Sequence, residues 1–359
     1  DERRERRERR EIIMRRGIAG ALRSVTKMSS RPSWQQTMLR IKDPKKSLDF
    51  YEKHLGMKLV DKYDFKAWEF SLYFLVSMKP GETLAFTPGT PEAREYLWNT
   101  EKVTLELTHN WGTEKEDSQV YHPGNQKNDG FGHIAFSVDD VYKASDELLA
   151  KGVDFKKKPD EGRMKGLAFA YDPDGYWVEL VKREQSSEDA PDFALSQTML
   201  RVKDAKKSLE FYTSVMGMQL VAERHYGPEK GDFSLYFLCN KNDVGPDVPK
   251  DPTDPEAMLY IKNVLYPQSV SVLELTHNHG TESDESFKHN NGNEEPTKGF
   301  GHIGYIVDDV YSFCDELEKA GVQFHKKPDE GGMKGLAFAL DPDGYWIEII
   351  KRGFDPSAV

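Results

Sequence analysis

The feature that most constrains this chain is an internal repeat. The segment TLELTHN at 104–110 returns as VLELTHN at 272–278. The segment GFGHIAF at 130–136 returns as GFGHIGY at 299–305. Because similarity at a fixed interval marks repeated structural units, the sequence predicts two copies of one fold in tandem.

Polar residues keep their spacing in both copies. His133 and Glu179 stand 46 positions apart, and so do His302 and Glu348. The chain has 359 residues, which is the length of about two ordinary domains. We therefore expect each domain to carry the same set of polar side chains.

The repeat and the composition also suggest the domain boundaries. We expect a first domain over residues 31–182, a linker over 183–193 and a second domain over 194–353. Residues 354–359 are expected to form a tail. Residues 1–30 are expected to be a disordered leader, because they begin with a low-complexity run of arginine and glutamate.

The leader differs in charge from the body of the chain. Residues 1–27 carry ten basic and five acidic side chains, although the whole chain has a net charge of −11. An acidic body argues against a nucleic-acid partner. Residues 14–30 contain arginine, serine and small apolar residues but no acid, which is typical of a mitochondrial or plastid transit peptide. An unstructured leader is the alternative interpretation.

Cysteine content and hydropathy bear on location. Cys239 and Cys314 are the only cysteines, too few for a disulfide framework, so we expect a reducing compartment, the cytoplasm. No segment reaches the roughly 18 consecutive apolar residues of a membrane span. We therefore expect no membrane partner.

Secondary-structure signals occur twice within each half. Asp43, followed by proline, predicts a helix start, and Gly56 predicts its end. Asp139-Asp140 predicts the start of a second helix that ends at Gly152. Each predicted helix is preceded by one strand-like run and followed by three. Short helices among many strands predict an α+β fold with mixed sheets.

Each strand that carries a repeated motif directs one polar side chain toward a concave inner surface, because successive side chains of a strand alternate between its faces. Burying a carboxylate is costly unless a partner compensates it. A single such glutamate is explained by the solvent face of an edge strand, but here four recur in matched contexts. The matched polar set comprises Gln36, Glu106, His133, Glu179, Gln197, Glu274, His302 and Glu348. A shared divalent cation with open positions is the simplest explanation, since the donors are mostly oxygen with one imidazole per set.

These residues resemble the glyoxalase I family of the vicinal oxygen chelate superfamily. The resemblance covers residues 34–182 and 195–351, and its most specific stretches are LELTHNWGTE, MKGLAF and DPDGYW. It implies four βαβββ modules paired into two glyoxalase domains with curved, mixed sheets. It also implies lactoylglutathione lyase activity, in which the hemithioacetal of methylglyoxal and glutathione becomes S-D-lactoylglutathione through an ene-diolate. The fused two-domain form is expected to be a monomer with two sites.

The resemblance divides the polar set into two metal centres that each draw on both halves, whereas spacing alone leaves pairing within each half equally open. It implies zinc, with nickel or another divalent metal as the alternative. Site one would comprise Gln36, Glu106, His302 and Glu348, and site two would comprise Gln197, Glu274, His133 and Glu179. By the same resemblance Glu348 and Glu179 are the principal catalytic bases. Glu106 and Glu274 would be the ligands opposite, able to act on the other substrate stereoisomer.

Glutathione, the co-substrate, carries two carboxylates that need basic partners. The resemblance assigns the γ-glutamyl end to Arg40 and Asn110 in site one and to Arg201 and Asn278 in site two. It assigns the glycine end to Lys298 and Lys326 in site one and to Lys157 and Arg163 in site two.

The two copies differ at the glycine end. Gly332 stands in the second copy where the first has Arg163, and Asp129 stands in the first copy where the second has Lys298. A carboxylate facing the glycine end would repel it. The sequence therefore predicts that site two has the lower affinity for substrate.

Three other functions fit parts of the pattern. An extradiol dioxygenase needs two histidines and a carboxylate around iron, whereas Gln36 and Glu106 occupy two of the positions here. A metal-dependent epimerase also moves a proton through an enolate, but it does not explain the basic residues. A non-catalytic protein that binds a small ligand would not require the four glutamates.

Overall fold

The computed structural model describes residues 32–79, 81–162, 164–186 and 190–354. The expected leader over 1–30, residues 355–359 of the expected tail and Arg163 lie outside the described residues. Within the described part, no helix combines the length and the apolar character that crossing a membrane requires.

The first half of the sequence forms two modules of one strand, one helix and three strands. The first comprises β1 (Ser33–Ile41), α2 (Pro44–Leu48), β2 (Met57–Phe65), β3 (Phe70–Ser77) and β4 (Thr104–Asn110), with α3 (Pro91–Asn99) inserted before β4. The second comprises β5 (Phe131–Val138), α4 (Val141–Ala150), β6 (Phe155–Lys157), β7 (Ala168–Tyr171) and β8 (Trp177–Lys182).

The second half repeats this order. The third module comprises β9 (Ala194–Val202), α5 (Ala205–Glu210), β10 (Gln219–Tyr226), β11 (Phe233–Cys239), α6 (Pro255–Tyr260) and β12 (Val272–Asn278). The fourth comprises β13 (Phe300–Val307), α7 (Val310–Lys319), β14 (Phe324–Lys326), β15 (Ala337–Leu340) and β16 (Trp346–Lys351). Wide π-type turns extend three of the helices: η1 (Asp49–His54), η3 (Phe211–Val215) and η6 (Ile261–Leu265). Short 3₁₀ turns are η2 (Thr113–Lys115), η4 (Pro228–Lys230), η5 (Lys241–Asp243) and η7 (Thr281–Ser283).

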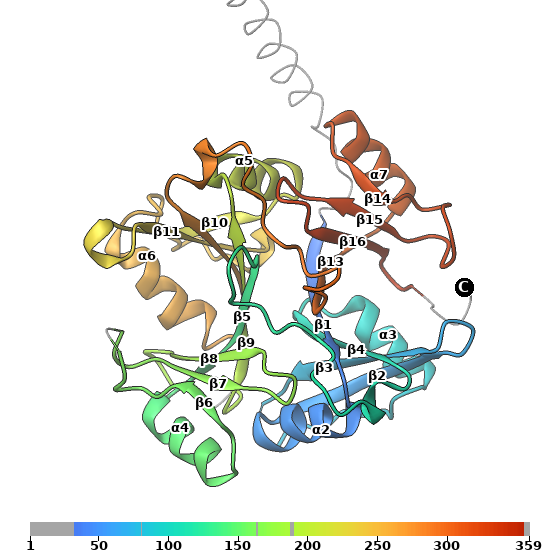
Figure 1. Ribbon diagram of the computed structural model, residues 1–359, viewed down its shortest axis with the longest axis horizontal. Coiled ribbons are helices and arrows are strands. Elements are labelled where there is room, and N and C mark those ends of the chain that lie inside the picture. The colour runs from blue at the N-terminus through green and yellow to red at the C-terminus, as the bar shows by residue number, and fades with distance from the viewer. Residues whose placement is uncertain (1–31, 80, 163, 187–189, 355–359) are drawn as a thin grey trace, which may run out of the picture.

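The sheets do not follow the two halves of the sequence. The described strands form two eight-stranded sheets, in the orders β14-β15-β16-β13-β1-β4-β3-β2 and β10-β11-β12-β9-β5-β8-β7-β6. The first and fourth modules therefore share one sheet, and the second and third share the other, as the neighbouring blue and red strands of Figure 1 show. β1 pairs antiparallel with β13 but parallel with β4, so the sheets are mixed. The predicted α+β fold of four βαβββ modules is confirmed.

The helices begin and end where the local sequence provides caps. The Asp43 carboxylate accepts a hydrogen bond from the backbone N–H of Lys45 at 3.0 Å, and Asp140 accepts one from the N–H of Tyr142 at 2.9 Å. These bonds satisfy donors that the first helical turn leaves free. Gly56 follows the first helix at φ +68°, a left-handed conformation that suits glycine.

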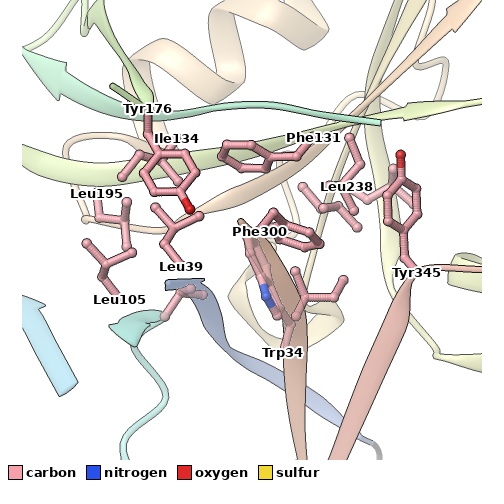
Figure 2. Packing of buried hydrophobic residues seen from close by; sticks show 14 of the residues in the cluster. Trp34, Leu39, Leu105, Phe131, Ile134, Tyr176, Leu195, Leu238, Phe300 and Tyr345 are labelled. Atoms are coloured by element: carbon pink, nitrogen blue, oxygen red, sulfur yellow. The ribbon is translucent and has the colours of Figure 1, made fainter. Parts of the chain in front are cut away.

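One apolar core connects the two sheets. Phe131 and Phe300, equivalent residues of the repeat, stack with ring centroids 5.0 Å apart and an angle of 9° between their planes. Tyr176 packs edge-on against Phe131, and Tyr345 packs edge-on against Phe300. Figure 2 shows the two phenylalanines between the two tyrosines. The halves therefore share a core instead of each burying its own.

The DPDG turn of the second module fastens it to the first. The Asp172 carboxylate accepts hydrogen bonds from the Tyr51 hydroxyl at 2.9 Å and from the backbone N–H of Asp174 at 2.9 Å. Asp174 accepts in turn from the N–H of Lys42 at 2.9 Å and from the Ser47 hydroxyl at 3.3 Å. These bonds cross from the second module to the end of β1 and to α2.

The second copy repeats the same contacts. Asp341 accepts from the Tyr212 hydroxyl at 2.8 Å, and Asp343 accepts from the N–H of Lys203 at 2.8 Å. Each turn thus joins a module to its predecessor in sequence, whereas each sheet joins modules from opposite halves. The two kinds of contact together fix all four modules relative to one another.

The turn yields a prediction for stability. Asp172→Ala leaves the Tyr51 hydroxyl and two N–H groups without their acceptor, and we expect the free energy of unfolding to fall by about 3 kcal/mol. Asp172→Asn keeps an acceptor oxygen, so the expected loss is about 1 kcal/mol. Urea unfolding measures both, with the exposed Asp146→Asn as the control.

The same variants test how the ionisation of Asp172 contributes to the pH dependence of stability. Burial and the neighbouring Asp174 carboxylate raise the pKa of Asp172, so ionisation of Asp172 is less favourable in the folded protein than in the unfolded chain. The contribution of Asp172 to stability is therefore greatest below the pKa of an unfolded aspartate and is lost as the pH rises through the raised pKa. Asp172→Asn should reduce this decline between about pH 5 and about pH 8. A decline equal to that of the unmodified protein would contradict the assignment.

Candidate metal centres

In each sheet, four adjacent strands contribute one polar side chain each. In the first sheet Glu348 comes from β16, His302 from β13, Gln36 from β1 and Glu106 from β4. Gln36 lies opposite Gly304 in the ladder between β1 and β13. Alternation along each strand then turns all four side chains to the same face of the sheet.

Site one is compact and buried. The Gln36 Nε2 atom lies 2.7 Å from a carboxylate oxygen of Glu106 and 2.7 Å from one of Glu348. His302 Nε2 lies 3.2 Å from the same oxygen of Glu106 and 3.0 Å from that of Glu348. No member of the set is more than 6% exposed. The structure thus groups residues from both halves of the sequence, the grouping that spacing alone had left open.

Site two has the same geometry in the second sheet. Gln197 Nε2 lies 2.7 Å from Glu274 and 2.8 Å from Glu179. His133 Nε2 lies 3.2 Å from Glu179 and 3.6 Å from Glu274. The two sites are therefore built alike on equivalent strands of the two sheets.

The chemistry of both sets fits a divalent cation. In site one, ligand atoms of Glu106, His302 and Glu348 all lie within 4.8 Å of one another. Two buried carboxylates at this separation repel each other unless positive charge compensates them. Rotating the Gln36 carboxamide presents its oxygen in place of its nitrogen, which gives three oxygen donors and one imidazole.

The pKa values of the two histidines reflect the negative charge of the carboxylates around them. Burial on its own lowers the pKa of His302, but the carboxylates of Glu348 and Glu106 outweigh it and raise that pKa to about 9. Burial on its own also lowers the pKa of His133, but the carboxylates of Glu179 and Glu274 outweigh it and raise that pKa to about 9. Positive charge is thus favoured at both centres.

An arginine lies near each centre: Arg40 is buried and Arg201 is half-buried. Arg40 donates to the carbonyl oxygen of Phe300 at 3.1 Å and to Asn293 Oδ1 at 2.8 Å. Arg201 donates to Asn125 Oδ1 at 2.8 Å. Among the described residues, no carboxylate forms an ion pair with either arginine. Neutral acceptors take up the hydrogen bonds of both guanidinium groups, and carboxylates such as Glu106 near Arg40 and Glu274 near Arg201 act on them only through space. Each guanidinium is of the kind that binds an anionic ligand.

Comparison with known proteins gives the family. The Glyoxalase/Bleomycin resistance protein/Dioxygenase superfamily model matches residues 34–180 and 194–349. The chain is 42% identical over 339 residues to glyoxalase I of Saccharomyces cerevisiae, covering 92% of this chain and 96% of that protein. It is 40% identical over 332 residues to lactoylglutathione lyase of Schizosaccharomyces pombe, covering 92% and 99%. The chain belongs to the glyoxalase I family.

Solved structures agree with the fold. The crystal structure of glyoxalase I from Zea mays superposes with a TM-score of 0.61 at 25% sequence identity, covering 89% of this chain and 92% of that chain. The resemblance to glyoxalase I that the motifs indicated is therefore confirmed. This family member has the fused arrangement of two glyoxalase domains.

Three groups near the sites of this glyoxalase I family member were not anticipated from the sequence. Asn125 and Asn293 orient the guanidinium groups, and the repeated Gly-Asn pairs at 124–125 and 292–293 were the available signal. Tyr266 donates its hydroxyl hydrogen to Gln197 Oε1 at 2.7 Å. Nothing in the repeat marks Tyr266, because its counterpart by alignment is a tryptophan.

The asparagines expected at the γ-glutamyl end have different neighbours in the two sites. Asn110 Nδ2 donates to the Tyr121 hydroxyl at 2.7 Å. The residue that corresponds to Tyr121 in the second copy is His289, which is buried. Burial lowers the pKa of His289 to about 4, so it is neutral at physiological pH.

The carboxylate of Asp129, on which the expectation of a weaker site two was based, is held by hydrogen bonds, and the order of the two affinities stays a prediction. The Asp129 carboxylate lies 2.6 Å from His122 Nε2 and accepts from Asn290 Nδ2 at 3.1 Å and from the backbone N–H of Gln126 at 2.7 Å. It is 3% exposed. These donors hold the carboxylate in place, and its charge also acts on the neighbouring Arg201. Lys298, its counterpart, lies just before β13 and is half-buried.

Metal content tests how the halves pair. We expect the zinc-loaded protein to hold two equivalents. Glu106→Gln with Glu348→Gln should damage site one alone and leave one equivalent, whereas Glu106→Gln with Glu179→Gln should damage both sites and leave none. Elemental analysis after dialysis measures this, with the exposed Glu147→Gln as a control. The reverse pattern would mean that the sites are formed within each half.

Proposed function

We propose that this chain isomerises the hemithioacetal of methylglyoxal and glutathione to S-D-lactoylglutathione at two active sites. The observation that supports this most directly is the convergence of glutamine, histidine and two glutamates, from both halves, in a chain closely similar to yeast lactoylglutathione lyases. The catalytic role of each residue is part of the proposal.

The reaction moves a proton between two adjacent carbons of the substrate. In site one, Glu348 takes the proton from the carbon that bears sulfur and returns it to the neighbouring carbonyl carbon, while the hydroxyl proton passes from the oxygen on the first carbon to the oxygen on the second. Burial raises the pKa of Glu348, against the lowering effect of His302. Glu179 has the same role in site two, where burial also raises its pKa.

Gln36, Glu106, His302 and Glu348 would hold the metal of site one, and Gln197, Glu274, His133 and Glu179 that of site two. We propose zinc, with nickel as the alternative. When bound, it supplies Lewis acidity that polarises the two adjacent oxygens of the substrate.

The neighbouring residues orient the substrate. Arg40 and Asn110 bind the γ-glutamyl end in site one, and Lys298 and Lys326 bind the glycine carboxylate. In site two the corresponding residues are Arg201, Asn278, Lys157 and Arg163. The Phe338 ring packs edge-on against the His302 imidazole with centroids 5.4 Å apart, and Phe169 packs in the same way against His133. These rings exclude water beside the reacting carbons and fit the methyl group of the substrate.

Each set of residues is complete within a single chain, so we propose that the enzyme works as a monomer. We propose the cytoplasm as its location. Import into mitochondria or plastids, directed by residues 14–30, is the alternative.

Single and double variants test the catalytic bases. Glu348→Gln and Glu179→Gln should each retain the turnover of the unmodified site, whereas the double variant should lose about 10²–10⁴-fold in kcat. Absorbance of the thioester product follows the reaction. Glu147→Gln should match the unmodified enzyme, and chelation should abolish turnover until metal is returned. A double variant with normal turnover would exclude both glutamates as bases.

A further inference from the structure

Two loops with almost the same sequence differ in their packing. Loop two, residues 159–167 beside site two, and loop one, residues 328–336 beside site one, differ only by Arg163 against Gly332. Met164 of loop two is 55% exposed, whereas its counterpart Met333 is half-buried. Leu167 is half-buried, whereas Leu336 is 1% exposed. The cause of this difference must lie in what each loop contacts.

Loop one rests against Trp68. A Cβ atom placed on Gly332 would lie 2.8 Å from Cζ2 of the indole, so the ring occupies the space that a side chain at this position would need. Trp68 stacks on Phe70 with centroids 6.4 Å apart. Met333 and Leu336 join the same apolar cluster, which includes Phe70. Loop one is therefore docked on the hairpin between β2 and β3.

Site two has no equivalent ring. Trp68 lies two residues before Phe70, and the residue two before the matching Phe233 is Gly231. Site one thus has an indole at position 68 and no side chain at position 332, whereas site two has glycine at 231 and an arginine at 163. A side chain at 332 would require the indole, which is 46% exposed, to move from its place against loop one.

Docking changes the surroundings of Lys326. Its Nζ donates to the carbonyl oxygens of Leu336 at 2.7 Å, Met333 at 3.1 Å and Lys327 at 3.4 Å. An ammonium group has three N–H donors, so none remains for a ligand. In site two, among the described residues, which do not include Arg163 of loop two, Lys157 Nζ donates to Leu167 at 2.7 Å and Lys158 at 3.3 Å. The third acceptor, Met333, comes from docked loop one.

We propose that Trp68 sets the substrate affinity of site one by docking loop one, which engages Lys326 with three backbone carbonyls. Site two, where the described residues offer Lys157 Nζ two carbonyl acceptors instead of three, then binds the glycine carboxylate of glutathione more tightly. This is the opposite order to that expected from Asp129. Trp68 acts through the loop and is a positioning residue. The inference rests on the proposed function for its effect on substrate, but not for the docking itself.

Trypsin measures docking without reference to activity. The bonds Lys165–Gly166 and Lys334–Gly335 lie in identical MKGLAFA segments, and each lysine Nζ contacts a carbonyl oxygen of its own loop. In the metal-loaded full chain we expect Lys165–Gly166 to be cut about tenfold faster, because cleavage follows the open population of each loop. Mass spectrometry of timed digests gives both rates.

Variants assign the difference to the indole. Trp68→Ala should raise the rate at Lys334–Gly335 about tenfold and leave that at Lys165–Gly166 unchanged. Gly332→Ala, which keeps the indole but adds the colliding Cβ, should do the same, and the double variant should equal Trp68→Ala alone. Trp111→Ala, which removes an indole bonded to Ser71, is the matched control and should change neither rate. Equal rates in the unmodified protein, or no effect of Trp68→Ala, would overturn the proposal.

Chains with one working site test the effect on substrate. In the Glu179→Gln background, where site one works, Trp68→Ala should lower KM for the hemithioacetal about threefold with kcat retained. In the Glu348→Gln background, where site two works, it should change neither constant. An unchanged or raised KM of site one would refute the link to Lys326. Absence of any lyase activity would instead refute the proposed function and leave the cleavage result standing.

Discussion

Both sites depend on the pairing of β1 with β13 and of β5 with β9. Each pair is antiparallel and joins strands from opposite halves of the sequence. Gln36 lies opposite Gly304 in this ladder, so a slip of one residue would turn either Gln36 or His302 to the other face of the sheet. Two buried glutamates in each site repel one another. The ladder must therefore hold the two glutamates of each site together against that repulsion. Burial of the large shared core behind the sheets offsets the free-energy cost of the repulsion.

The local features were predictable because they depend on neighbours in sequence. Asp43 and Asp140 cap helices through hydrogen bonds to residues two positions away, and strand periodicity gave the modules and the inward faces of the glutamates. The partner of each module was not predictable in this way. Spacing between His133 and Glu179 is the same whether the first half closes on itself or on the second, so only the family resemblance suggested the crossed arrangement that the sheets have.

The features that the sequence did not reveal depend on contacts between distant loops. Asp129 looked like a charge facing the substrate, but its partners include Asn290, which lies in the other half. Trp68 and Gly332 are separated by most of the chain, and each is unremarkable alone. Such pairs have no periodicity and no local motif, so their complementarity becomes visible only when the folded chain places the indole against the glycine.

Fusion of the two copies explains how such differences can persist. In a symmetric dimer a substitution changes both sites at once, whereas in a tandem chain it changes one. Asp129 joins loops from the two halves at their junction, where the backbone N–H of Gly130 also donates to Asn290 at 3.0 Å. The residue at that position in the second copy is Lys298, which is half-buried. One copy can thus contribute to the junction or hold a docked loop while the other retains its basic residues. Under the proposed function, the two sites can then work over different ranges of substrate concentration.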